Sequence, residues 1–119
     1  MQEREYVSPD GQLKFLVICP DGDLTMGFDG YPWHTHGSIL ADLSGLSEAE
    51  ATERLVTDLM TNISVITVRR IGGNITDAWI SDDPSDDLAS YQQYGEPTET
   101  IEFRRWDGTP VEVQTNHAS

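Results

Sequence analysis

The sequence is poor in cysteine, in lysine and in long apolar runs, and each shortage excludes a class of protein. Cys19 is the single cysteine among 119 residues, so no internal disulfide can form and nothing indicates secretion. The longest purely apolar run, FLVIC at 15–19, is far shorter than the roughly 20 residues that a membrane-spanning helix needs. The charged start MQEREYVS lacks the apolar core of a signal peptide. We therefore expect a cytoplasmic protein that forms one domain over 1–119.

Basic residues are also scarce, because 7 Lys and Arg stand against 21 Asp and Glu, for a net charge of −14. Such a surface repels phosphate backbones and anionic membranes, which argues against binding to nucleic acid or to a membrane. The same surface attracts a basic protein and speeds its association. Two plainer explanations stay open: the acidity serves solubility alone, or it suits an environment of high salt.

Alternating apolar residues and turn signals predict strands joined as hairpins. Asp-Gly pairs, which favour tight turns, occur at 10–11, 21–22, 29–30 and 107–108. Around them, periodicity predicts strands within the segments REYV, QLKFLVIC, LTMGF, ISVITVRR, ITDAWIS, ETIEFRRW and PVEVQ. The pairs Arg69-Arg70 and Arg104-Arg105 would each place one side chain on either face of a strand, to pair with acids across the sheet or to bind a small anion.

Two helices are expected between these strands. Ser47 and Glu50 form a capping box for a helix over about 47–62, whose apolar stripe covers the sheet and consists of Leu55, Val56, Leu59, Met60 and Ile63. Asp83 and Pro84 suit the start of a shorter helix over about 84–94, and Gly95 suits its end. The predicted fold is α+β, with a mainly antiparallel sheet of about five to seven strands. Residues 115–119 are expected to form a short flexible tail.

The segment GFDGYPWHTHG at 27–37 raises the question of a metal site. His34 and His36 are two residues apart, so in extended chain both point to one side, and Asp29 is a candidate third ligand. His117, the remaining histidine, lies in the terminal tail. The alternative is a loop in which Tyr31, Pro32 and Trp33 pack against the sheet while the histidines make ordinary hydrogen bonds. We favour the packed loop and predict no metal.

Motifs of catalysis and phosphate binding are missing. Cys19 ends an apolar alternating strand, where a cysteine is usually a small buried hydrophobe. No Gly-x-Ser-x-Gly elbow occurs, and IGGN at 71–74 lacks the lysine of a phosphate-binding loop. The sequence therefore predicts no catalytic residues, no cofactor and no enzymatic activity.

The stretch 77–99 carries seven acids, no lysine or arginine, and three aromatic residues. DDPSDD lacks the alternating oxygens, central glycine and closing glutamate of an EF-hand loop. Two interpretations remain: a capped helix start with a solvated acidic face, or a contact surface anchored by aromatics. For the second, the candidate partner-binding residues are Asp82, Asp83, Asp86, Asp87, Tyr91, Tyr94 and Trp33.

In general character the chain resembles the small, acidic, single-domain immunity proteins of bacteria, which bind and neutralise a cognate toxin. The resemblance rests on WISDDPSDDLASYQQYGEPTE, on size, and on the missing signal sequence and catalytic motifs. It implies an inhibitor whose acids meet the substrate groove of a basic protein, such as a toxin enzyme. The alternatives are a small metal- or ligand-binding protein or enzyme that uses His34 and His36, and a non-catalytic structural subunit.

Overall fold

The computed structural model describes residues 3–114, which form two antiparallel sheets and three α-helices. The first sheet has the order β1-β2-β3-β4 and consists of β1 (Arg4–Val7), β2 (Lys14–Ile18), β3 (Thr25–Phe28) and β4 (His34–His36). The second has the order β6-β5-β7 and consists of β5 (Ile66–Ile71), β6 (Asn74–Ile80) and β7 (Glu99–Arg104). The predicted α+β class with antiparallel pairing is confirmed, and its strands are divided between two sheets.

Both predicted helices are present, and a third precedes them. α2 (Glu48–Met60) is capped by Ser47, whose hydroxyl accepts from the Glu50 backbone N–H at 3.1 Å. α3 (Pro84–Tyr94) is capped by the Asp83 carboxylate, which accepts from the Asp86 N–H at 3.2 Å. α1 (Gly37–Ser44) was not predicted, because its start at His36 has no side-chain cap to signal it.

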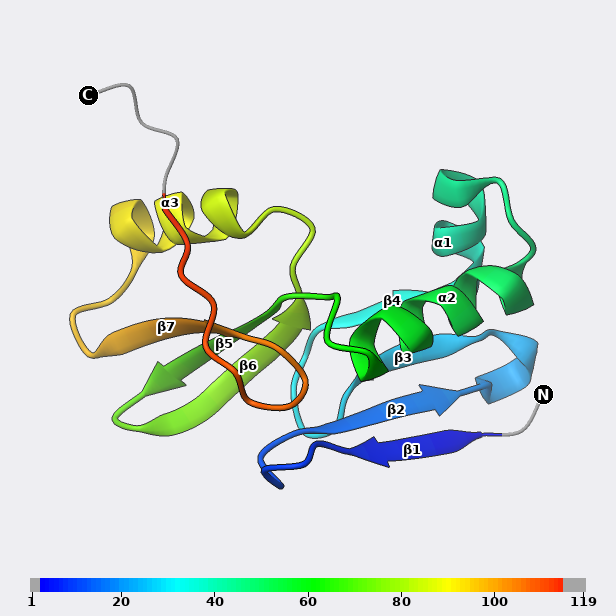
Figure 1. Cartoon of the computed structure of the whole chain (residues 1–119), viewed down its shortest axis with the longest axis horizontal. Coiled ribbons are helices and arrows are strands. Elements are labelled where there is room, and N and C mark those ends of the chain that lie inside the picture. The colour runs from blue at the N-terminus through cyan, green and yellow to red at the C-terminus, as the bar shows by residue number, and fades with distance from the viewer. Residues whose placement is uncertain (1–2, 115–119) are drawn as a thin grey trace.

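The two sheets lie side by side, and the helices lie on the same side of them in Figure 1, α2 over the first sheet and α3 over the second. Residues of both sheets and of α2 share one buried cluster, which includes Phe15, Met26, Phe28, Leu59, Ile66, Val68 and Trp106. The predicted stripe of α2 is confirmed at Val56 and Leu59, whereas Ile63 lies beyond the helix end and is exposed. Cys19 is only partly buried at the edge of this core.

The predicted C-terminal hairpin is wrong in its second strand. Within the described residues, 110–114 pair with β7 only through an isolated bridge between Pro110 and Arg104 and a backbone hydrogen bond from the Val111 N–H to the Phe103 carbonyl, at 2.9 Å. Pro110 has no N–H to donate, which removes one rung of a ladder at the point where it would begin. The predicted tail, 115–119, lies outside the described residues.

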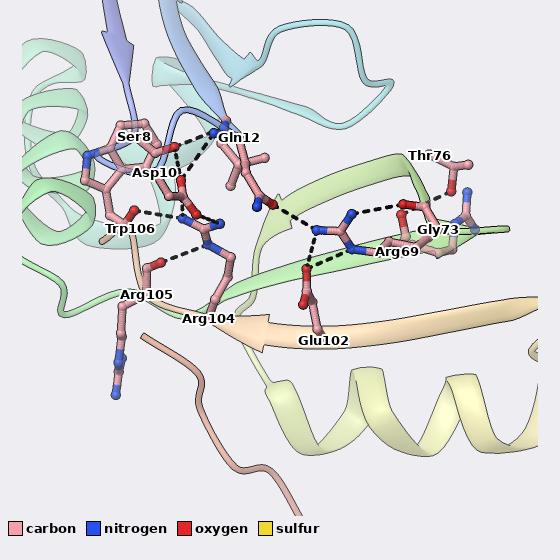
Figure 2. A network of polar contacts seen from close by, with 12 residues as sticks. Ser8, Asp10, Gln12, Arg69, Gly73, Thr76, Glu102, Arg104, Arg105 and Trp106 are labelled. Atoms are coloured by element: carbon pink, nitrogen blue, oxygen red, sulfur yellow. Dashed lines mark hydrogen bonds and ion pairs between the residues drawn. The ribbon is translucent and has the colours of Figure 1, made fainter. Parts of the chain in front are cut away.

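Two arginines connect the second sheet to the β1–β2 turn of the first (Figure 2). Arg104 donates to both carboxylate oxygens of Asp10, at 2.6 and 3.2 Å, and to the Trp106 carbonyl at 2.9 Å. Arg70 donates to Glu102 on β7 and to the Gln12 side chain, both at 2.9 Å. The expectation that arginines pair with acids is thus confirmed for Arg70 across the sheet, while Arg104 reaches an acid of the other sheet.

Candidate functional site

The predicted acidic surface begins with Asp82 and Asp83 in the loop between β6 and α3 and continues with Asp86 on α3, and all three are exposed. Asp83 is also the N-cap of α3, and Asp86 lies in the first turn. Acids at this end of a helix are stabilised by its dipole. Both interpretations of DDPSDD therefore fit the same residues: the segment is a capped helix start, and it presents carboxylates to solvent.

Asp87 differs from its neighbours because its carboxylate points into the molecule. Its Oδ2 accepts three hydrogen bonds, from Thr67 Oγ1 at 2.9 Å, Trp79 Nε1 at 3.0 Å and Ser81 Oγ at 2.6 Å. Thr67 is fully buried, so its hydroxyl depends on this acceptor. Asp87 therefore attaches α3 to the sheet, and we do not propose it as a partner-binding residue.

Tyr91 and Tyr94 lie toward the other end of α3 and line a hollow beneath that helix. The Tyr91 hydroxyl donates to the Glu99 carbonyl at 2.9 Å, which connects α3 to β7. Tyr94 keeps 74% of its surface exposed. The two tyrosines therefore do not share a hollow with Asp82, and the predicted set is divided between two places.

Trp33 and Asp82, which are far apart in the sequence, line one hollow of about 150 Å³ between α1, β4 and the end of β6. Its apolar walls include Ile39, Leu40, Leu43, Leu55 and Ile80. A second hollow of about 220 Å³ between α1 and α2 shares Leu40, Leu43 and Leu55 and adds Arg54 and Asp58. We call these two adjoining hollows the α1 groove.

Sequence reasoning missed the apolar residues of the α1 groove. Leu43 is 83% exposed and Ile39 is 49% exposed, although both are large and apolar. Their spacing of four residues, with Leu40 between them, is that of one helix face, so the signal was present in SILADLS. It was hidden because a helix of eight residues with no side-chain cap is difficult to recognise.

Residues 29–33, which carry Trp33, form a packed loop as the sequence suggested, whereas His34–His36, also expected in that loop, form the short strand β4 that pairs with β3. Tyr31 and Trp33 are partly buried against the core, and the Trp33 ring lies 6.2 Å from that of Phe28. Gly27 allows this approach, because a Cβ there would come within 2.7 Å of the Trp33 carbonyl oxygen. The loop thus holds Trp33 at the edge of the α1 groove.

The two histidines of β4 do point to one side, with ring centroids 5.1 Å apart. The Nδ1 atom of His34 lies 3.1 Å from the Pro32 carbonyl oxygen. The Nδ1 atom of His36 lies 3.3 Å from Thr25 Oγ1 and 3.1 Å from Asp23 Oδ2. Within residues 3–114, no group of three or more His, Cys, Asp or Glu side chains is placed to hold a metal ion, so Asp29 does not complete a site with the histidines there. His117 lies outside the described residues.

In the described part of the chain, none of the helices is both long enough and apolar enough to cross a bilayer. Comparison with known proteins finds no family model, no curated protein and no solved structure that matches this chain.

Proposed function

We propose that this chain is an acidic binding protein that inhibits a basic protein partner, in the manner of the immunity proteins that it resembles. The observation that carries the proposal is the α1 groove, in which exposed apolar side chains lie beside carboxylates on a molecule of net charge −14. Apolar anchors inside a polar rim are typical of protein interfaces.

The apolar part of the groove favours contact with a partner surface. Leu43 and Ile39 project from α1 into solvent next to Leu40 and Leu55, and burial of such side chains yields roughly 25 cal/mol per Å². Trp33 supplies an aromatic anchor at one end. Hot spots of binding energy are enriched in residues of this type at the centre of an interface.

The charge of the groove and of the whole molecule selects the kind of partner. Asp58 and Asp82 line the two hollows, together with Arg54, while Asp42 is exposed on α1 and Asp86 is exposed in the first turn of α3. A second copy of this chain would bring another net charge of −14 to the same place, which opposes self-association. A basic protein with an apolar patch is complementary in both respects. The activity of such a protein would be inhibited if this chain covered the site at which it binds its own acidic substrates.

The first experiment retains partners of the tagged protein from native lysate through a wash at moderate salt, and identifies them by mass spectrometry. Each purified partner is then tested for direct binding kinetics and for loss of its own activity. We expect a basic protein that binds stoichiometrically and is inhibited. A partner that binds with no change in its activity, or a scatter of basic proteins lost at moderate salt, would contradict the proposal.

Variants then locate the surface. I39S/L43S should increase the dissociation rate at least tenfold, because about 1.4 kcal/mol of apolar contact is lost. D82N/D86N should slow association and flatten its dependence on salt. The matched control E5Q/E96Q also removes two negative charges. Glu5 lies on β1, at the opposite edge of the first sheet, and Glu96 lies in the loop after α3. This control should leave the association and dissociation rates within about twofold of those of the wild type. Equal effects of the two double charge variants would mean that only net charge matters.

A further inference from the structure

Beneath α3 lies a hollow of about 210 Å³ that is separate from the α1 groove. β5 presents Arg69 to it, opposite Ile101 of β7, and Trp79 of β6 forms another wall. Tyr91 and Tyr94 line it from the helix side. An apolar cavity of about 150 Å³ is enough to hold benzene, so this space accommodates a molecule with one aromatic ring.

Arg69, one of the residues that line the hollow, carries a donor without an acceptor. Arg69 Nε is buried and, among residues 3–114, it is the buried side-chain polar atom that lacks a hydrogen-bond partner. The carboxylate oxygen paired with it, Glu99 Oε1, is 3.9 Å away, which is too far for a hydrogen bond. Leaving a buried donor unsatisfied costs about 1–3 kcal/mol, so the position favours a bound acceptor.

Glu99 is the complementary half of this incomplete pair. Its side chain is only 13% exposed, and its Oε2 accepts from the Glu96 N–H at 3.3 Å. Its Oε1 is left facing Arg69 across the 3.9 Å gap. A group that accepts from Arg69 and donates to Glu99 would therefore complete both sides of the pair at once.

Charge in and around the hollow selects among ligands. Arg69 and Glu99 balance each other, and Asp87 carries a negative charge whose Oδ2 is already occupied by three donors. An anion would meet two carboxylates on a molecule of net charge −14. A cation would satisfy Glu99 but would leave the Arg69 N–H unpartnered and lie beside its positive charge. A neutral ligand avoids both costs.

We propose that the hollow beneath α3 binds a small neutral aromatic amide or a heteroaromatic ring with an amide-type edge. Its carbonyl oxygen accepts from Arg69 Nε, its N–H donates to Glu99 Oε1, and its ring lies against Trp79 and Tyr91. The aromatic walls contribute stacking, and the two polar groups fix the orientation. This site does not depend on the α1 groove or on a protein partner.

Three probes of nearly equal shape test the charge requirement: benzamide, which is neutral, benzoate, which is an anion, and benzamidinium, which is a cation. Binding is followed by the NMR signal of the Trp79 indole N–H, which donates to Asp87 in the wall of the hollow. The signal is assigned by its absence in W79F. We expect benzamide to shift it with a dissociation constant at least about fivefold below those of the other two probes.

Variants of the two adjacent arginines provide the matched comparison. R69Q should weaken benzamide binding about tenfold, because a charge-assisted hydrogen bond is lost. R70Q makes the same charge change on the opposite face of β5, where Arg70 contacts Glu102, and should change binding less than about twofold. Ser90, which is exposed on α3 and lines the hollow, allows a blocking variant if R69Q does not fold: S90F should abolish the benzamide shift.

Each opposite outcome overturns the proposal. A Trp79 signal unmoved by all three probes would mean that water alone fills the hollow. Tightest binding of benzoate would make Arg69 an anion site, and tightest binding of benzamidinium would make Glu99 a cation site. Equal losses of benzamide affinity in R69Q and R70Q, or unchanged benzamide binding by S90F, would mean that benzamide binds outside the hollow.

Discussion

Arg104 and Asp10 join the two sheets at the scale of single residues. The Arg104 side chain is 6% exposed, and besides both oxygens of Asp10 it contacts the carbonyls of Arg105 and Trp106. On the other side, Asp10 also accepts from the Ser8 hydroxyl at 2.6 Å. Hydrogen bonds from Arg104, with a smaller contribution from Ser8, lower the pKa of Asp10 to about 2. A buried guanidinium is therefore paired in a way that connects residues 94 positions apart.

We predict that D10N lowers the free energy of unfolding at pH 7 by on the order of 1 to 2 kcal/mol, a value reduced for the partial exposure of the carboxylate. The pKa of Asp10 is lower in the folded chain than in the unfolded one, where it is near 3.8. Its stabilisation is thus fully present above about pH 5 and is lost as the pH falls from 4 toward 2. Urea unfolding of wild type and D10N over this range measures the difference. A difference that stays constant down to pH 2 would contradict the assignment.

Adjacent acids of α3 show what residue types alone leave undecided. The sequence grouped Asp86 with Asp87, yet the first is exposed and the second accepts hydrogen bonds from Thr67 and Trp79 of the sheet and from Ser81 just after β6. Both lie in the first helical turn, where acids are favoured in general. Only the position of the sheet beneath the helix determines which carboxylate has a structural role.

At the scale of elements, α3 is held by polar contacts more than by burial. Every residue of α3 remains at least partly exposed, whereas α2 buries Ala51, Thr52, Val56 and Leu59. The polar contacts include those of Asp87 with Thr67, Trp79 and Ser81, of Tyr91 with the Glu99 carbonyl, and of the Ser85 hydroxyl with the Gln114 carbonyl at 2.9 Å. This arrangement leaves the space that forms the hollow beneath the helix.

We predict that D87A costs about 1–3 kcal/mol of unfolding free energy, because the buried Thr67 hydroxyl and the Trp79 indole N–H lose their acceptor. The matched control is D86A, which removes an acid from the same helical turn and should cost less than about 0.5 kcal/mol. Urea denaturation measures both, and amide exchange in α3 should quicken in D87A alone. Equal costs for the two variants would mean that Asp87 acts only through the helix dipole.

Helix α1 has no side-chain cap in its sequence, and its position depends on packing against other parts of the molecule. Gly37, at its start, packs so closely that a Cβ would lie 3.1 Å from the Leu24 side chain. The helix ends at Gly45 in the left-handed conformation, with φ 76°. Contact with α2 then sets which apolar residues of α1 remain exposed in the groove.

At the scale of the whole molecule, charge acts on stability as well as on partners. The net charge of −14 produces self-repulsion that opposes the compact state. The surface ion pairs that offset it, such as Lys14 with Glu5 at 3.1 Å, are exposed and contribute little. Repulsion is therefore the larger of the two effects.

We predict that raising NaCl from about 50 to about 500 mM increases the melting temperature by roughly 3–6 °C, which corresponds to about 1 kcal/mol. The reason is that salt screens repulsion among the acids more than it weakens the few ion pairs. E5Q/E96Q, with two fewer negative charges, should respond less. Thermal unfolding followed by circular dichroism measures both proteins. A fall in melting temperature with salt would show that the ion pairs dominate.

The sequence by itself determined the class of fold, the two capped helices and most strands, because capping boxes, apolar periodicity and Asp-Gly turns act over a few residues. It also determined the sign of the surface charge. Only the tertiary structure decided the division into two sheets, the pairing of Arg104 with Asp10, and the inward turn of Asp87. The same is true of the meeting of Trp33 with Asp82. These features join residues far apart in the chain, and no local pattern encodes which distant surfaces will pack together.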